Sequence, residues 1–279
     1  MKIQSLGYRT DIMFARFDGT ITDHGEYVVV ATPANPGFHW GNFLLFPRPP
    51  VPGDQDLWPN LFRKEFARDP LVKHIALGWD TTSPMRESEL FVSQGFEAHT
   101  SVVLTSELPR MPEKFDREVS VRPLRTDSEW EAATQLQIDV REPIFKLENY
   151  SAFKRAQMAR YRRMSEQGKG HWFGAYLGSR LVGDLGLYVE GPVGRFQNVG
   201  THPDFRRRGI CGRLVYEAAM LGLHVMGAKT LVMVADETYH AARIYEAAGF
   251  RPTERQAGVS LRPRADLSES GASPIFNVY

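Results

Sequence analysis

The sequence predicts a mixed α/β protein made of two similar lobes, each a mixed, mostly antiparallel sheet flanked by helices. In the second half of the chain, strand-like apolar stretches alternate with segments whose apolar residues recur at helical spacing. The segment 90–96 (LFVSQGF) resembles 244–250 (IYEAAGF), and 74–80 resembles 230–236 in pattern. These similarities indicate a tandem repeat of one fold.

The second half is expected to follow the order β-α-α-β-β-β-α-β-α-β. It opens with a strand over 119–124, after which Asp127 is expected to cap a helix that ends near Ile138. The remaining elements are a helix over 151–167, strands over 171–177, 181–188 and 195–201, a helix over 209–226, a strand over 230–235 and a helix over 240–248 that ends at Gly249.

The helix 209–226 is expected to bury one face, because its apolar residues fall on one side of a helix. Those residues are Ile210, Leu214, Ala218, Leu221 and Val225. The helix 57–67 is its expected counterpart in the first half, capped by Asp56 and with Pro59 in its first turn.

A polar segment from Ser106 to Ser120 contains two prolines and shows no periodicity, which is typical of a linker. The predicted division is a first lobe over residues 1–110, a linker over 111–118, a second lobe over 119–265 and a tail over 266–279.

Composition excludes several classes of function. The chain has 279 residues with 34 basic and 33 acidic side chains, so charge gives no reason to expect nucleic acid or an anionic membrane as a partner. No apolar run approaches the roughly 18 residues that span a bilayer, and no signal peptide is recognisable at the start. A single cysteine, Cys211, fits a reducing cytoplasm. No metal-ligand spacing or serine-hydrolase motif occurs.

The segment Thr201–Leu214 (THPDFRRRGICGRL) carries the strongest chemical signal. A strand ends, a short basic loop follows, and a helix opens at glycines. Glycine lets a ligand approach the backbone, and the first amides of a helix have no partner inside the helix. Together with the helix dipole, these features predict a diphosphate site.

Together with the segment 241–250, this region resembles the GNAT superfamily of acyl-CoA-dependent N-acetyltransferases over residues 119–261. Arg206-Arg207-Arg208-Gly209-Ile210-Cys211 is similar to that family's pyrophosphate motif, R/Q-x-x-G-x-G/A, and 244–250 is similar to its closing helix and strand. The resemblance implies acetyl-CoA as co-substrate and direct transfer of the acetyl group to an amine.

The resemblance also implies roles for individual residues. The pyrophosphate would bind the amides of Arg208, Gly209, Ile210, Cys211, Gly212 and Arg213. The pantetheine arm would lie along the strand that ends in Thr201, and the amide of Val199 or Gly200 would bind the thioester oxygen. A glycine at position 200 is consistent with a bulge that turns such an amide outward. Tyr245 would give a proton to the departing thiolate.

Three positions depart from the family pattern. Cys211 replaces the last glycine or alanine of the motif, and Thr238 stands where an asparagine often contacts the pantetheine arm. Met233 occupies the place of a general-base glutamate, so the base is not identified. Its candidates are Glu190, Asp184 and His202.

Some of these residues also have a purely structural interpretation. Cys211 is expected to be a small packing residue and not a nucleophile. The run Lys154, Arg155, Arg160, Arg162 and Arg163 is expected to be an exposed helical face and not an anion site. The predicted function is acetyl transfer from acetyl-CoA to a primary amine, with a small molecule expected as the acceptor. A non-catalytic acyl-CoA sensor and an enzyme with a hydroxyl acceptor are the alternatives. The sequence leaves open whether the chain forms a homo-oligomer.

The first lobe is expected neither to catalyse nor to bind cofactor. The segment 45–54 contains four prolines where the diphosphate loop would be, and each lacks a backbone donor. Asp54 and Asp56 place negative charge at the start of the next helix, where a phosphate would compete with them. Phe91 stands at the position of Tyr245 and cannot give a proton.

Overall fold

The computed structural model describes residues 1–236 and 241–263. Packing divides the chain into two units, which we describe separately. The first unit contains Met1–Val103 together with the segment that begins at Glu254, and the second contains Leu104–Thr253. The predicted tail, 266–279, lies outside the described residues.

This division differs from the boundaries expected from the sequence, which kept residues 119–265 in one lobe. The difference arises from β11 (Arg251–Leu261), which pairs antiparallel with β4 (Ile75–Trp79). Ala257 lies opposite Trp79, and Leu261 lies opposite Ile75. The stretch expected to be a linker, 111–118, belongs to the second unit.

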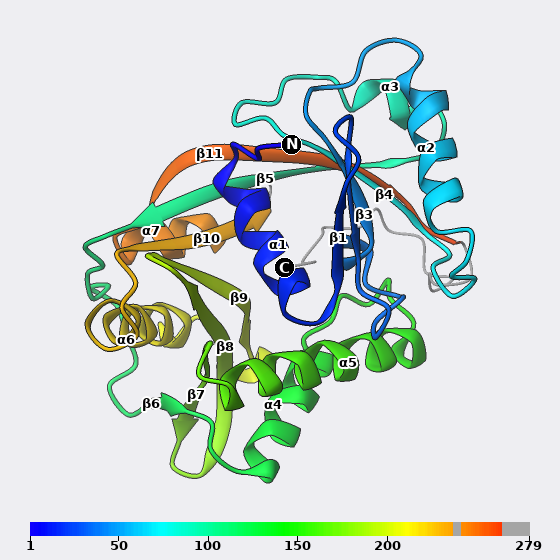
Figure 1. The fold of residues 1–279 in the computed structure, drawn as a ribbon. Helices are drawn as coiled ribbons and strands as arrows, with labels where there is room; N and C mark the ends of the chain where they lie inside the picture. Colours follow the sequence, from blue (N-terminus) through cyan, green and yellow to red (C-terminus); the bar gives the residue numbers. More distant parts are fainter. Residues whose placement is uncertain (237–240, 264–279) are drawn as a thin grey trace. The chain divides into compact units, whose positions relative to one another are not determined.

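The first unit contains a mixed sheet in the order β1-β2-β3-β4-β11-β5 (Figure 1). Strands β1 to β3 are joined antiparallel, whereas β3 and β4 are parallel. The elements before β11 are α1 (Leu6–Asp18), β1 (Thr20–Asp23), β2 (Val28–Ala31), η1 (His39–Gly41), β3 (Phe43–Phe46), α2 (Asp54–Glu65), β4, α3 (Glu89–Val92) and β5 (Glu97–Ser106).

Aromatic side chains from α2 and the sheet form the core of the first unit. Trp58 of α2 stacks on Phe46 of β3 with ring centroids 3.7 Å apart, and Phe62 lies in the same cluster. Val259 of β11 is also buried in this cluster, so the late strand completes the first unit's core. Burying such large side chains removes much apolar surface from water.

The second unit contains a sheet in the order β10-β9-β8-β7-β6. Strands β6 to β9 pair antiparallel, and β10 is parallel to β9. Its elements are β6 (Ser120–Pro123), α4 (Asp127–Asp139), α5 (Leu147–Glu166), β7 (Gly170–Leu177), β8 (Arg180–Glu190), β9 (Val193–Thr201), η2 (Pro203–Phe205), α6 (Ile210–His224), β10 (Thr230–Asp236) and α7 (Ala241–Ala247).

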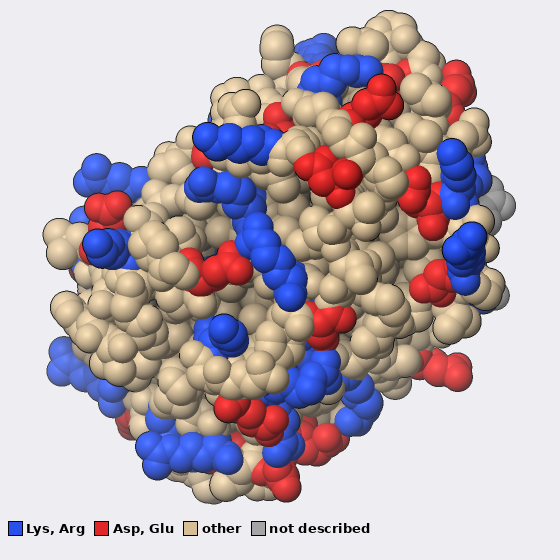
Figure 2. Space-filling view, viewed as in Figure 1, with Lys and Arg blue, Asp and Glu red and all other residues tan. Residues whose placement is uncertain are grey.

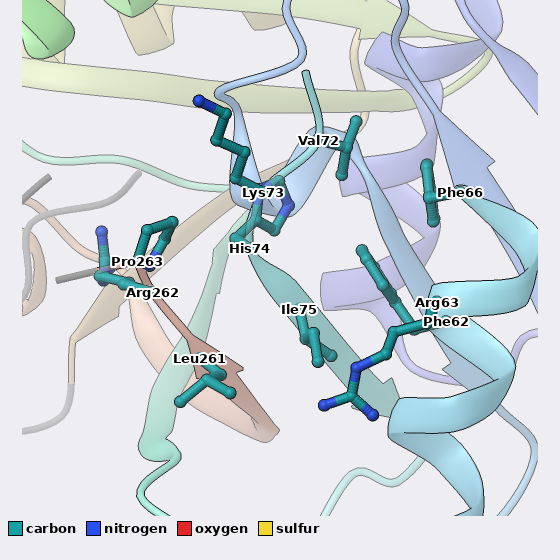
Figure 3. Close-up of a pocket in the computed structure, with 10 residues that line it drawn as sticks. All are labelled: Phe62, Arg63, Phe66, Val72, Lys73, His74, Ile75, Leu261, Arg262 and Pro263. Carbon is teal, nitrogen blue, oxygen red and sulfur yellow. The ribbon is translucent and has the colours of Figure 1, made fainter. Parts of the chain in front are cut away.

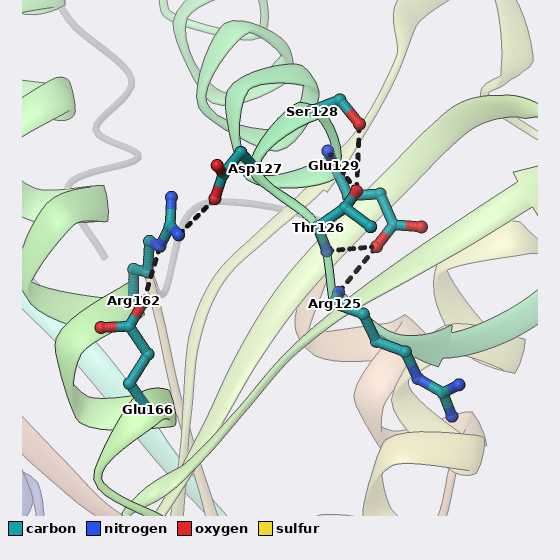
Figure 4. Close-up of polar contacts among 7 residues, drawn as sticks. All are labelled: Arg125, Thr126, Asp127, Ser128, Glu129, Arg162 and Glu166. Atoms are coloured by element: carbon teal, nitrogen blue, oxygen red, sulfur yellow. Dashed lines mark hydrogen bonds and ion pairs between the residues drawn. The ribbon is translucent and has the colours of Figure 1, made fainter.

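The start of α4 differs from the sequence prediction. Thr126, not Asp127, caps the helix: its hydroxyl accepts from the Glu129 amide, and the Glu129 carboxylate accepts from the Thr126 amide (Figure 4). This reciprocal pair satisfies donors that a helix start leaves open. Asp127 instead forms an ion pair with Arg162 of α5, which connects α4 to α5 (Figure 4). Arg162 also forms an ion pair with Glu166 of its own helix.

The two halves of the chain repeat one succession of elements. The series β3-α2-β4-α3-β5 in the first unit has the same order as β9-α6-β10-α7-β11. This is the tandem repeat that the sequence predicted. On α6, Ile210, Leu214 and Ala218 are buried as expected, whereas Val225 is exposed because the helix ends at His224.

Charged side chains of both signs are interspersed over the face shown in Figure 2, in keeping with the balanced charge of the chain. None of the helices in the described residues combines the length and apolar character needed to span a bilayer.

Candidate active site

Strands β9 and β10 pair only where they begin. In the described part of the chain, their pairing runs from Val193 opposite Thr230 to Arg195 opposite Val232. Both strands continue well past this pairing, and Figure 1 shows them diverging. Beyond Arg195, the edge of β9 that faces β10 is therefore available to an extended ligand, which can bind as an added strand.

A bulge interrupts β9 within this open stretch. Asp184 pairs with Gly200, but Gly186 pairs with Gln197, so β9 has one more residue than β8 between these pairs. Asn198 lies in the bulge with φ of 47°, a left-handed conformation that is uncommon for a residue other than glycine. The bulge expected near Gly200 is therefore present just before it.

The basic loop that follows β9 leads into the start of α6. Gly209 precedes the helix with φ of 81°, and Arg207 also has a positive φ, of 65°. The amide of Arg213 donates to the Gly209 carbonyl at 3.2 Å. The amides of the three residues between them precede this first helical bond, so they are oriented as donors for an anion.

The segment expected to be a linker packs against this loop. Arg208 forms an ion pair with Asp116 at 2.8 Å, and Arg213 donates to the Asp116 carbonyl at 2.7 Å. A Cβ added to Gly209 would lie 2.5 Å from the Lys114 carbonyl oxygen. The requirement for glycine at 209 therefore has a cause that sequence reasoning missed, in addition to the expected approach of a ligand.

The arginines of the loop differ in their surroundings. Arg206 and Arg207 are exposed, whereas Arg208 is partly buried and engaged by Asp116. Arg206 donates through Nε to the Thr201 carbonyl at 3.3 Å. Among the described residues, neither Arg206 nor Arg207 forms an ion pair, so both charges face solvent.

The helix α7 carries the predicted proton donor. Tyr245 is 6% exposed, and its carbonyl accepts from the Phe250 amide where the chain leaves the helix. Burial raises the pKa of the Cys211 thiol to about 12. A thiol of that pKa is protonated at neutral pH, which favours the packing role over nucleophilic attack. Thr238 lies outside the described residues.

The three candidate bases lie in different places. Glu190 is exposed at the end of β8, opposite Val193 and far along the strand from the bulge. His202 follows β9, and its ring nitrogen accepts from the Asp204 amide. Asp184 is fully buried beside the bulge, and burial raises its pKa to about 7 despite hydrogen bonds donated by Trp172 and Gln137.

Two residues on α5 correct the expectation of an exposed basic face. Lys154 and Arg160 are buried and Arg162 is half-buried, whereas Arg155 and Arg163 are exposed. Burial lowers the pKa of Lys154 to about 7. The Lys154 ammonium donates to Gln157 at 2.8 Å and lies near the rings of Tyr150 and Phe153. The pattern of charges along the sequence gave no signal for this burial.

The first unit contains a pocket of about 360 Å³ (Figure 3). Its walls include Phe62, Phe66 and Ile75, together with the basic residues Arg63 and Lys73. None of its lining residues is among the predicted site residues. In the described residues, no group of histidine, cysteine and acidic side chains is arranged to hold a metal ion.

Comparison with known proteins agrees with this geometry. Residues 168–252 match the family model described as the acetyltransferase (GNAT) domain. That match spans the bulge, the basic loop, α6 and Tyr245. No curated protein matches the chain.

Solved structures resemble most of the chain in fold. A GCN5-related N-acetyltransferase from Kribbella flavida has a TM-score of 0.66 at 17% identity, over 95% of this chain and 100% of that one. A functionally unknown conserved protein from Staphylococcus epidermidis has a TM-score of 0.66 at 14% identity, over 88% and 94%. A tandem GNAT protein from the clavulanic acid biosynthesis pathway has a TM-score of 0.50 at 14% identity, over 83% and 74%. Residues 168–252 therefore match the GNAT acetyltransferase model, and most of the chain has the fold of solved GNAT proteins, a tandem one included.

Proposed function

We propose that the second unit transfers the acetyl group of acetyl-CoA to a primary amine on a small molecule. The observation that carries the proposal is the sequence of features along β9: an open edge, a bulge, and a loop that leads to the start of α6. An extended thioester arm and a diphosphate require these features in that order.

The cofactor would be held mostly by backbone. The pyrophosphate accepts from the amides of Ile210, Cys211 and Gly212, where the dipole of α6 favours negative charge. The backbone amides of Arg208 and Gly209, which precede the helix, are further candidates for binding the pyrophosphate. The exposed side chains of Arg206 and Arg207 add positive charge outside the loop.

The chemistry is a direct transfer. The neutral amine attacks the thioester carbon, and the carbonyl oxygen becomes negative as the C–N bond forms. An amide at Val199 or Gly200, just after the bulge, would donate to that oxygen. The C–S bond then breaks, and Tyr245 gives its proton to the departing thiolate. Of the candidate bases, Glu190 is disfavoured by its distance along β8 from the bulge.

The first unit is proposed not to bind cofactor. Its strands β3 and β4 stay paired to their ends, where Phe46 lies opposite Trp79 and the Asp80 amide donates to the Phe46 carbonyl at 2.8 Å. The Asp54 carboxylate accepts from Arg48 and from the Val51 amide, so negative charge occupies the loop. This pairing leaves no open edge of the kind found on β9.

Calorimetric titration with acetyl-CoA, followed by a thiol-release assay over a panel of amines, tests the proposal. We expect one acetyl-CoA per chain and release of free thiol with at least one amine. Tight binding without thiol release from any amine would instead support a sensor, and release with alcohols alone would support a hydroxyl acceptor. Absence of binding would refute the cofactor assignment.

A further inference from the structure

A continuous chain of buried hydrogen bonds runs beneath the bulge of β9. It joins Lys154 and Gln157 of α5 to Asn198, then to Gln137 of α4 and Asp184 of β8. All five side chains are at most 7% exposed. Buried polar groups of this kind are costly unless each is satisfied, so the geometry of one member constrains the next.

The bulge residue is held from two helices. The Asn198 side chain donates from Nδ2 to Gln157 Oε1 at 2.9 Å, and the Asn198 carbonyl accepts from Gln137 Nε2 at 2.8 Å. One contact fixes the side chain and the other fixes the peptide group that leads to Val199. The left-handed φ of Asn198 is therefore supported from both sides of the residue.

Two buried hydrogen bonds fix the orientation of each glutamine amide. Gln157 Oε1 accepts from both Asn198 and the Lys154 ammonium, so rotation of its amide would turn an NH₂ group toward two donors. Gln137 Nε2 donates to both the Asn198 carbonyl and Asp184 Oδ1, the latter at 2.7 Å. Rotation of this amide would turn an oxygen toward two acceptors.

We infer that Gln137 and Gln157 are positioning residues for acyl transfer, which hold the bend at Asn198 and so direct the amides of Val199 and Gly200. The inference rests on the proposed function, because it assigns those amides to the thioester oxygen. Neither glutamine touches a reacting atom; both act through Asn198. Lys154 and Asp184 fix the two amides in the orientation that the bend requires.

The opposite hydrogen-bonding roles of the two glutamines give a matched experiment. Gln157→Glu keeps an oxygen that accepts from Asn198 and Lys154, so kcat should stay within about threefold of the parent. Gln137→Glu removes the donor and places a second carboxylate beside Asp184. We expect its kcat to fall about 10- to 100-fold, less than or similar to the loss of one oxyanion donor. The KM for acetyl-CoA should change much less, because the diphosphate loop is untouched.

Gln137→Met and Gln157→Met remove either contact without adding charge, and both should lower kcat like Gln137→Glu. Thermal unfolding of each variant identifies those that remain folded at the assay temperature. Equal losses in Gln157→Glu and Gln157→Met would overturn the inference, as would a parental kcat in folded Gln137→Met.

Backbone amide chemical shifts of residues 198–200 provide a readout that needs no acceptor. They should match the parent in Gln157→Glu and move in both methionine variants. If the parent releases no thiol with any amine, the proposed function fails, and the positioning role fails with it. Unmoved shifts in the methionine variants, with an active parent, would refute the positioning role alone.

Discussion

The carboxylate of Asp184 lies directly beneath Gly200, its cross-strand partner. A Cβ at position 200 would lie 2.7 Å from Asp184 Oδ1 and 2.9 Å from Gln137 Nε2. The absence of a side chain at Gly200 thus lets the strand lie over a buried, hydrogen-bonded carboxylate.

Gly200→Ala should therefore disturb the bulge. The methyl group has to displace either the carboxylate or the Gln137 amide, both of which are enclosed, so we expect a loss of roughly 1–3 kcal/mol in the free energy of unfolding. The kcat should fall at least several-fold. Urea unfolding and steady-state kinetics measure both effects. An alanine variant with parental stability and kcat would show that the strand can shift freely here.

Gly209→Ala should weaken acetyl-CoA binding. The position combines a φ of 81° with contact to the Lys114 carbonyl, so the new methyl group must move the loop whose amides are assigned to the pyrophosphate. We expect a five- to hundredfold rise in Kd, about 1–3 kcal/mol, measured by calorimetry.

Gly227→Ala is the matched control. Gly227 has a φ of 79°, but a Cβ there meets nothing within 4 Å. It carries the same backbone strain without touching the loop, so its stability should fall while its acetyl-CoA affinity stays parental. Equal affinity losses in the two variants would point to general destabilisation.

Tyr245→Phe should slow the reaction while leaving acetyl-CoA affinity nearly unchanged. The substitution keeps the buried ring and removes the proton that the departing thiolate needs. A fall in kcat of roughly 10- to 1000-fold is expected for loss of one general acid. Kinetics and calorimetry together test the role. Retention of the full kcat, with the chemical step shown to limit the rate, would remove Tyr245 from the mechanism.

The first unit should lose stability in mild acid. Burial lowers the pKa of His74 to about 4 and of His99 to about 3, and it lowers that of His39 as well. Between about pH 6.5 and 4 the unfolded chain binds protons that the folded chain excludes, so the free energy of unfolding falls as the pH drops. His74 alone accounts for about 3 kcal/mol across that range.

Unfolding by urea at a series of pH values measures this slope. His99→Gln should reduce this slope, because the unfolded chain then binds one proton fewer that the folded chain excludes. The exposed His224→Gln should leave it as in the parent. A parental slope in His99→Gln would mean that this histidine does not contribute to the acid sensitivity.

Much of the second unit follows from local pattern. The bounds of the helices and strands around the basic loop were predicted within a few residues. Each of these elements has its own local signal, which is a periodic apolar pattern, a capping residue or a glycine at its end. The roles of Thr126 and Lys154 were not. A threonine and an aspartate side by side both suit a helix cap, and nothing in a run of basic residues marks the one that packs inward.

The missed features share a physical cause, which is that they depend on partners distant in sequence. The polar stretch 111–118 has the composition of a linker, yet Asp116 bonds two arginines almost a hundred residues later. Gln137 and Gln157 are unremarkable on their helices until Asn198 is placed between them. The element order expected from the sequence includes a last strand after Gly249, but it does not predict the sheet that β11 joins.

The position of β11 between β4 and β5 has a consequence for the growing chain on the ribosome. Domains usually fold in the order in which they are synthesised. Here the first unit lacks an inner strand until the second unit, Leu104–Thr253, has been translated. Its nascent form exposes the edge of β4, which is open to aggregation and to capture by chaperones. The second unit does not depend on a strand that is synthesised later, so we expect it to fold before the first unit.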